Sequence, residues 1–128
     1  MEIVSTITLS ISGALLMYAG GSRVASPIKN YLKNSGITLS NEVNTINEAR
    51  GVGALMAFGG ITALLGVFLH TLTLNSHIAA ALIFLGFAIG RLISMKLDGP
   101  PNKLLVTGLI SELILGAMNI FCLVMSLN

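Results

Sequence analysis

Two charged residues lie inside stretches of the sequence that are otherwise apolar. Arg91 precedes the end of one stretch by about six residues, and Glu112 lies about eight residues into the next. At about 1.5 Å per helical residue, these positions are roughly 9 Å and 12 Å from the ends that a short turn would join. A charge that faces lipid alone is costly. The sequence therefore predicts that Arg91 and Glu112 form an ion pair inside a bundle of antiparallel helices.

Further polar residues are expected at the same end of this bundle. Asp98 follows Arg91, and Asn119 follows Glu112, at the i, i+7 spacing that places two residues on one helical face. A Glu and an Arg at the start of an earlier apolar stretch are expected on the same side of the membrane. The predicted polar cluster consists of Glu48, Arg50, Arg91, Asp98, Glu112 and Asn119.

Three interpretations of this cluster are open. It can be a salt-bridge network that fixes helix packing, a binding site for a small anion, lipid head group or hydrophobic ligand, or a proton or cation relay centred on Glu112. The sequence offers no metal-ligand spacing, no Ser-His-Asp set and no phosphate-binding loop, so we expect no catalytic residue, no metal and no cofactor. His70 and His77 are expected to be bystanders beside a turn at the membrane surface, and Cys122 a small apolar residue.

The elements that would hold these residues are long apolar helices. The chain is 54% hydrophobic and 9% charged, with a mean hydropathy of +0.89, whereas soluble domains carry about 25% charged residues. Asn75-Ser76 and residues 98–102 are typical of turns. The predicted fold is an all-α integral membrane protein, a single domain over residues 1–128 with four transmembrane helices at about 3–20, 41–72, 78–97 and 104–127.

The long connection between the first two helices contains a further helical signal. Ser26 followed by Pro27 is typical of a helix start, and Gly36 of a helix end. Between them, apolar residues fall on one face and two lysines on the other. The pattern predicts a short amphipathic helix at residues 26–35 on the membrane surface, with a solvated loop as the alternative.

Small residues in two of the helices predict close helix contacts. Gly86 and Gly90 form a GxxxG pattern before Arg91, and Gly53, Ala57 and Gly60 form a similar stripe. These contacts could lie within one chain or in a homo-oligomer.

The distribution of basic residues predicts the orientation. All seven Lys and Arg residues fall in or toward the side that holds residues 21–50 and the turn at 98–103. The positive-inside rule then places the connection 21–50 in the cytoplasm and both termini outside. Because the basic residues form no run, we expect no binding of nucleic acid.

Several short motifs resemble a known family. They are Asn47–Gly51 at the start of the second helix, Gly90-Arg91 with Asp98–Pro100 near the end of the third, and Glu112 in the fourth. They are similar to an uncharacterised bacterial family of short four-helix integral membrane proteins, a domain of unknown function. The resemblance implies a bacterial inner-membrane protein but no activity, cofactor or partner. It singles out Arg50, Arg91, Asp98 and Glu112.

Together these features favour a non-enzymatic small inner-membrane protein, an accessory or ligand- or lipid-binding subunit that acts through the polar cluster. The alternative is a small oligomeric transporter that uses Glu112 as an ion- or proton-coupling carboxylate. Small multidrug exporters are similar in size and span number, but their carboxylate lies in the first helix, where this chain has only hydroxyl groups. We expect contacts with membrane lipids, and either a homo-oligomer or a larger membrane complex.

Overall fold

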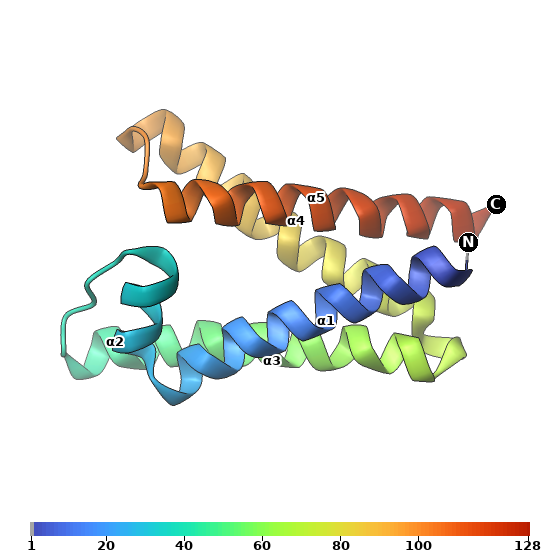
Figure 1. Ribbon diagram of the computed structural model, residues 1–128, viewed down its shortest axis with the longest axis horizontal. Coiled ribbons are helices and arrows are strands. Elements are labelled where there is room, and N and C mark those ends of the chain that lie inside the picture. The colour runs from blue at the N-terminus through green and yellow to red at the C-terminus, as the bar shows by residue number, and fades with distance from the viewer. Residues whose placement is uncertain (1) are drawn as a thin grey trace.

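The computed structural model describes residues 2–128, which form helices joined by short connections (Figure 1). Four of the helices are long and apolar enough to cross a membrane, which confirms the predicted fold class in these terms. Within the described residues there is no strand. The elements are α1 (Glu2–Ala25), α2 (Pro27–Asn30), the π-helical turn η1 (Tyr31–Ser35), α3 (Val43–Phe68), the 3-10 turn η2 (His70–Leu72), α4 (Thr73–Asp98) and α5 (Lys103–Leu127).

The outer surface of the long helices is strongly apolar. Phe58, Phe68 and Leu82 are 68%, 80% and 70% exposed. A soluble domain of this size would bury such side chains, because exposure of apolar surface to water is unfavourable. The interior core is small and is centred on Leu16 and Phe84. This distribution suits a multi-pass membrane protein whose outer surface contacts lipid.

Helices α1 and α3 pack closely through their small residues. A Cβ atom added at Gly20 would collide with backbone atoms of Gly53 and Ala57, and one added at Gly60 would collide with the backbone nitrogen of Met17. The stripe predicted on the second apolar helix therefore serves packing within the chain. Small residues at such contacts let two helix backbones approach each other.

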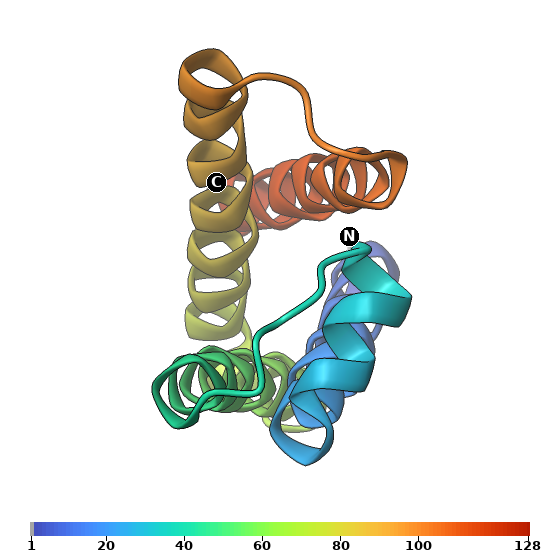
Figure 2. The ribbon, with the colours of Figure 1, turned by 90° about the vertical axis from the view of Figure 1, so that its left-hand side faces the viewer.

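The predicted close contact at the GxxxG pattern of Gly86 and Gly90 is not present within the described chain. Atoms of other residues do not approach within 4 Å of a Cβ built at Gly86 or Gly90. Helix α4 instead packs against α5, and this pair diverges from the α1–α3 pair toward the end of the molecule that carries α2 (Figures 1 and 2). At that end, the wide end of the bundle, the backbones of the two pairs lie farther apart than at the other end (Figure 1).

The short segment α2–η1 follows α1 at this wide end, where α2 contacts α1 and α3 and η1 contacts α5 (Figure 2). The helix begins at Pro27 and its following turn ends at Gly36, whose φ of 65° favours glycine, as the sequence predicted. The side chain of Asn102 donates a hydrogen bond to the Ser35 carbonyl, and its oxygen accepts one from the Leu105 amide, both at 2.9 Å. Asn102 therefore caps α5 and attaches η1 to the α4–α5 turn.

The predicted amphipathic character of this segment is borne out only in part. Ile28 and Leu32 are exposed, but Lys29 and Lys33 are exposed as well. Tyr31, which belongs to the predicted apolar face, packs instead against the Arg23 guanidinium. Ile28 and Leu32 are thus free to contact lipid. Insertion of this segment into the membrane surface stays a prediction.

The predicted helix boundaries need three corrections. The first helix does not end at Gly20 but continues to Ala25. The second long helix begins at Val43 with Glu42 as its N-cap, and it ends at Phe68. The turn before α4 is formed by residues 69–72 and does not lie at Asn75-Ser76. Both of these residues lie within α4.

Hydrogen bonds to α3 explain why α4 is not broken there. Thr73 donates from its hydroxyl to the Gly66 carbonyl at 2.8 Å, and Ser76 donates to the Thr62 carbonyl at 2.6 Å. The Ser76 side chain packs where a Cβ atom of Gly66 would otherwise stand. Polar residues that normally favour a turn are therefore satisfied inside the helix.

The α1–α3 contact should be sensitive to added side-chain volume. We expect Gly60→Leu to lower the free energy of unfolding by about 1–3 kcal/mol, because the new side chain overpacks the helix contact. Gly86→Leu is the matched control, since open space surrounds that position. Thermal unfolding in detergent measures both, and equal stability of the two variants would contradict the proposed packing.

Candidate functional site

The predicted ion pair is present between α4 and α5. Arg91 Nε donates to Glu112 Oε1 at 2.8 Å, and the two side chains are 24% and 12% exposed. The antiparallel arrangement of α4 and α5 places Arg91 and Glu112 at the same depth in the bundle, as their sequence positions indicated. The Arg91 guanidinium also lies 5.7 Å from the centre of the Phe87 ring. Each charge thus has a partner in a region with little water.

A second buried cation, Arg23, was missed by the sequence analysis. It lies in the last turn of α1 and is only 8% exposed. Its Nη1 donates to the Met56 sulfur at 3.1 Å, and its guanidinium lies 4.6 Å from the centre of the Tyr31 ring. The Nε atom is buried and makes no hydrogen bond. Among residues 2–128, no carboxylate forms an ion pair with Arg23.

Arg23, Arg91 and Glu112 line one cavity of about 270 Å³, the charged cavity. Its walls come from α1, α3, α4, α5 and η1. Leu16 and Phe84 line it further from the α2 end, and with them the wall becomes apolar. The three charged side chains sum to one excess positive charge inside the bundle.

A groove along α4 adjoins the charged cavity, and α1, η1, α3 and α5 supply its other walls. It has a volume of about 430 Å³, and Arg23 and Arg91 line both spaces. Gly86 and Gly90 form part of its floor, where the absence of side chains leaves α4 uncovered. The two arginines therefore stand between a cavity inside the bundle and a groove that opens on its side.

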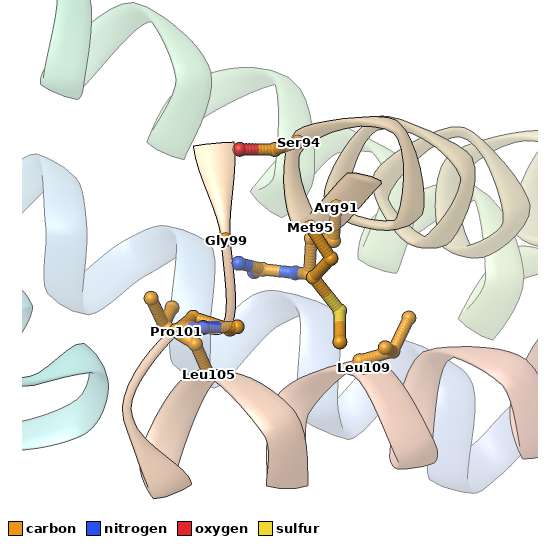
Figure 3. Close-up of a pocket in the computed structure, with 7 residues that line it drawn as sticks. All are labelled: Arg91, Ser94, Met95, Gly99, Pro101, Leu105 and Leu109. Atoms are coloured by element: carbon orange, nitrogen blue, oxygen red, sulfur yellow. The ribbon is translucent and has the colours of Figure 1, made fainter. Parts of the chain in front are cut away.

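A smaller cavity of about 100 Å³ lies between the end of α4 and the start of α5 (Figure 3). Arg91 extends from α4 toward the connecting segment at Gly99 and Pro101, while Leu105 and Leu109 face this space from α5 (Figure 3). Arg91 and Leu105 line all three spaces. Arg91 is thus central to the site.

Three predicted members of the polar cluster lie elsewhere. Glu48 and Arg50 are exposed because their neighbour Ala49 occupies the buried face of the first turns of α3. Successive helical residues point about 100° apart, so the two charges flank that face without entering the bundle. Asp98 is also exposed and accepts a hydrogen bond from Ser94 at 3.0 Å. Their inclusion in the buried cluster was wrong.

Asn119 is fully buried, but it belongs to a separate polar network near the other end of the bundle. Its Nδ2 donates to Ser12 Oγ at 3.0 Å and to the Leu115 carbonyl at 2.8 Å. Because a carbonyl can only accept, these bonds fix the amide orientation and aim Oδ1 at His77 Nδ1, 2.8 Å away. His77 then donates from Nδ1, and its Nε2 accepts from Ser5 Oγ at 2.6 Å.

This network corrects the prediction for His77. The side chain lies within α4, which already begins at Thr73, and it is fully buried and bonded to Asn119 and Ser5, so it is not a bystander. The network joins α1, α4 and α5, and Cys122 lies buried beside it, 3.8 Å from Thr8 Oγ1. The described residues include no group of three or more His, Cys, Asp or Glu residues that could hold a metal ion.

The Arg91–Glu112 pair can be tested by a double-mutant cycle. We expect Glu112→Gln to lower the free energy of unfolding by about 2–4 kcal/mol, because it leaves a buried guanidinium without its carboxylate. Arg91→Met should be harmful for the converse reason, and the double variant should recover part of the loss. Thermal unfolding in detergent gives the three values. Simple additivity would show that the two residues do not stabilise each other.

Comparison with known proteins places this chain in a family. The family described as Domain of unknown function (DUF4345) matches residues 4–123, a segment that contains all three charged residues of the cavity. No curated protein and no solved structure matches the chain. The resemblance indicated by the sequence motifs is thus confirmed at the level of an uncharacterised family. Since the match covers most of its length, the chain belongs to the family Domain of unknown function (DUF4345).

Proposed function

We propose that this protein is a non-enzymatic small membrane protein that binds an amphiphilic membrane ligand between its helices, as an accessory or binding subunit. The observation that carries this proposal is the charged cavity, which combines buried charges with a deeper apolar wall. Small-molecule sites are typically concave, mostly apolar and equipped with a few convergent polar groups. An amphiphile has the same division of polar and apolar parts.

The adjoining groove supports a ligand that arrives from the lipid bilayer. The groove's volume of about 430 Å³ lies within the range of roughly 300–1,000 Å³ that ligand sites occupy. Gly86 and Gly90 leave the side of α4 open, so a lipid chain beside the bundle can lie against its backbone. Membrane lipids are therefore the proposed partners, and such binding is compatible with a homo-oligomer or a larger membrane complex.

The proposed location is the inner membrane of a bacterium, with both termini outside and residues 21–50 in the cytoplasm. This orientation is supported by the asymmetry of Lys and Arg, all seven of which lie in or toward the α2 end. The charged cavity would then open toward the cytoplasmic leaflet. Anionic head groups at a membrane surface attract Lys and Arg side chains that lie close to it.

A transporter that uses Glu112 for coupling is the second candidate. Glu112 is the one carboxylate that borders the charged cavity among the described residues. Its 2.8 Å contact with Arg91 favours a structural role over exchange of a proton or cation. Additive losses in the double-mutant cycle would reverse this preference, because Glu112 would then act independently of Arg91.

Ligand binding should depend on the free volume of the cavity. Gly108 lines the charged cavity, and a Cβ atom added there meets no atom within 4 Å. We expect Gly108→Leu to fill the cavity and to reduce the lipid that co-purifies with the protein, measured by native mass spectrometry. Gly21→Leu is the matched control, because Gly21 is equally unobstructed and exposed on the outside of α1. Equal lipid content in the two variants would contradict the proposal.

The proposed orientation can be tested with reporter fusions. Alkaline phosphatase is active only outside the cytoplasm, so its fusion after Asn128 should be active. A fluorescent reporter that folds only in the cytoplasm should be dark at the same position. The opposite pair of signals would reverse the topology.

A further inference from the structure

We infer that Arg23 is the anion receptor of the charged cavity and that the ligand is a lipid with a phosphate or carboxylate head group. This inference rests on the proposed function, because it names the chemistry of the ligand that the cavity binds. It goes beyond the predicted Arg91–Glu112 cluster, of which Arg23 is no part.

The charges of the cavity are not balanced. Arg91 is neutralised by Glu112 at 2.8 Å, whereas Arg23 is 8% exposed and has no ion-pair partner among residues 2–128. A buried charge normally has a partner, because removal from water disfavours the charged form. The position that lacks an anion is therefore beside Arg23.

The contacts of Arg23 orient its guanidinium without neutralising it. The Tyr31 ring lies against one face, 4.6 Å from the ring centre to the guanidinium carbon, and the Met56 sulfur accepts a bond from Nη1. A thioether is a weak acceptor, and the buried Nε has no partner. A guanidinium held in this way offers paired N–H donors that match two oxygens of a phosphate or carboxylate.

Neutral polar groups border the same cavity. Asn34 and Ser35 from η1 and Ser111 from α5 line it together with Arg23. These side chains and backbone groups can bond to head-group oxygens that the guanidinium does not reach. Glu112 is the carboxylate that lines this cavity, and its ion pair with Arg91 at 2.8 Å offsets its repulsion of an anionic ligand.

The depth of Arg23 favours a lipid over a free anion. Arg23 lies in the last turn of α1, and Leu16 lies on the same helix roughly 10 Å further from that end. A head group at Arg23 would therefore be near the membrane surface, and its chain would extend along Leu16 and Phe84. A free phosphate ion would leave this apolar wall uncovered.

The test compares ligands that differ only in the head group. Lysophosphatidic acid and monoacylglycerol with the same acyl chain are titrated into the full-length protein in a neutral detergent, and affinity is measured by isothermal titration calorimetry. We expect lysophosphatidic acid to bind at least tenfold more tightly. A fatty acid of the same chain length should also bind more tightly than monoacylglycerol. Inorganic phosphate should bind far more weakly than lysophosphatidic acid.

Variants assign the preference to Arg23. Arg23→Gln should remove the preference for lysophosphatidic acid over monoacylglycerol. Lys29→Gln is the matched control, because Lys29 is an exposed cation at the same end of the molecule. Arg23→Lys, which keeps the charge but not the paired donors, should retain part of the preference. The comparison of ligands on the unmodified protein does not depend on the folding of any variant.

Each outcome separates the two proposals. Equal affinity of the unmodified protein for both lipids would overturn the role of Arg23 and leave amphiphile binding in place. Binding of neither lipid would overturn the proposed function as well. Inorganic phosphate that binds as tightly as lysophosphatidic acid would overturn a lipid ligand in favour of a free anion. Loss of the preference in Lys29→Gln would assign it to surface charge.

Discussion

The close approach of α1 and α3 is the constraint on which the rest of this structure depends. Glycines on both helices bring the backbones into contact over a long stretch, and Gly20, Gly53 and Gly60 have no room for a Cβ atom. In lipid, where apolar surface gives helices no reason to associate, such packing is a principal source of association. It makes α1 and α3 one unit, so that α4 and α5 pack as a second unit beside them.

The two units are joined differently at their two ends. Toward one end, Asn119 and His77 form hydrogen bonds with each other and with hydroxyl groups of α1. This polar network is complete within the protein. Toward the other end the units diverge, and the space contains two arginines but only one carboxylate. A network in which every polar group has a partner stabilises one fixed arrangement of the helices. In a network that lacks a partner, a donor remains able to bond to a ligand. The same polar chemistry therefore serves packing at one end and, in the proposed function, ligand recognition at the other.

The sequence predicted those features that depend on the length of an apolar stretch or on the position of a charged residue along it. Four apolar stretches of sufficient length gave the helices, and the matched depths of Arg91 and Glu112 gave the ion pair. Features that depend on helix rotation were missed. The sequence alone did not show that Ala49 takes the buried position of its turn and leaves Glu48 and Arg50 outside.

The remaining errors arose where a residue has two possible roles. Gly20 was interpreted as the end of the first helix, but it lies within α1 and provides the contact with α3. Arg23 was consequently assigned to a loop, although the helix continues past it. In the same way Asn75-Ser76 was interpreted as a turn, and this concealed the burial of His77. Glycine and hydroxyl residues in a membrane helix thus require tertiary contacts before their role can be assigned.

The hydrogen bond between Asn102 and Ser35 has a consequence for the order of folding. It joins residues 67 positions apart, so its formation closes a loop that contains all of α3 and α4. Closure of a long loop is entropically unfavourable until the intervening helices are in place. Contacts between helices adjacent in sequence can form earlier, because they are more local. The wide end of the bundle is therefore among the last parts to be completed, after every helix that surrounds it has been made.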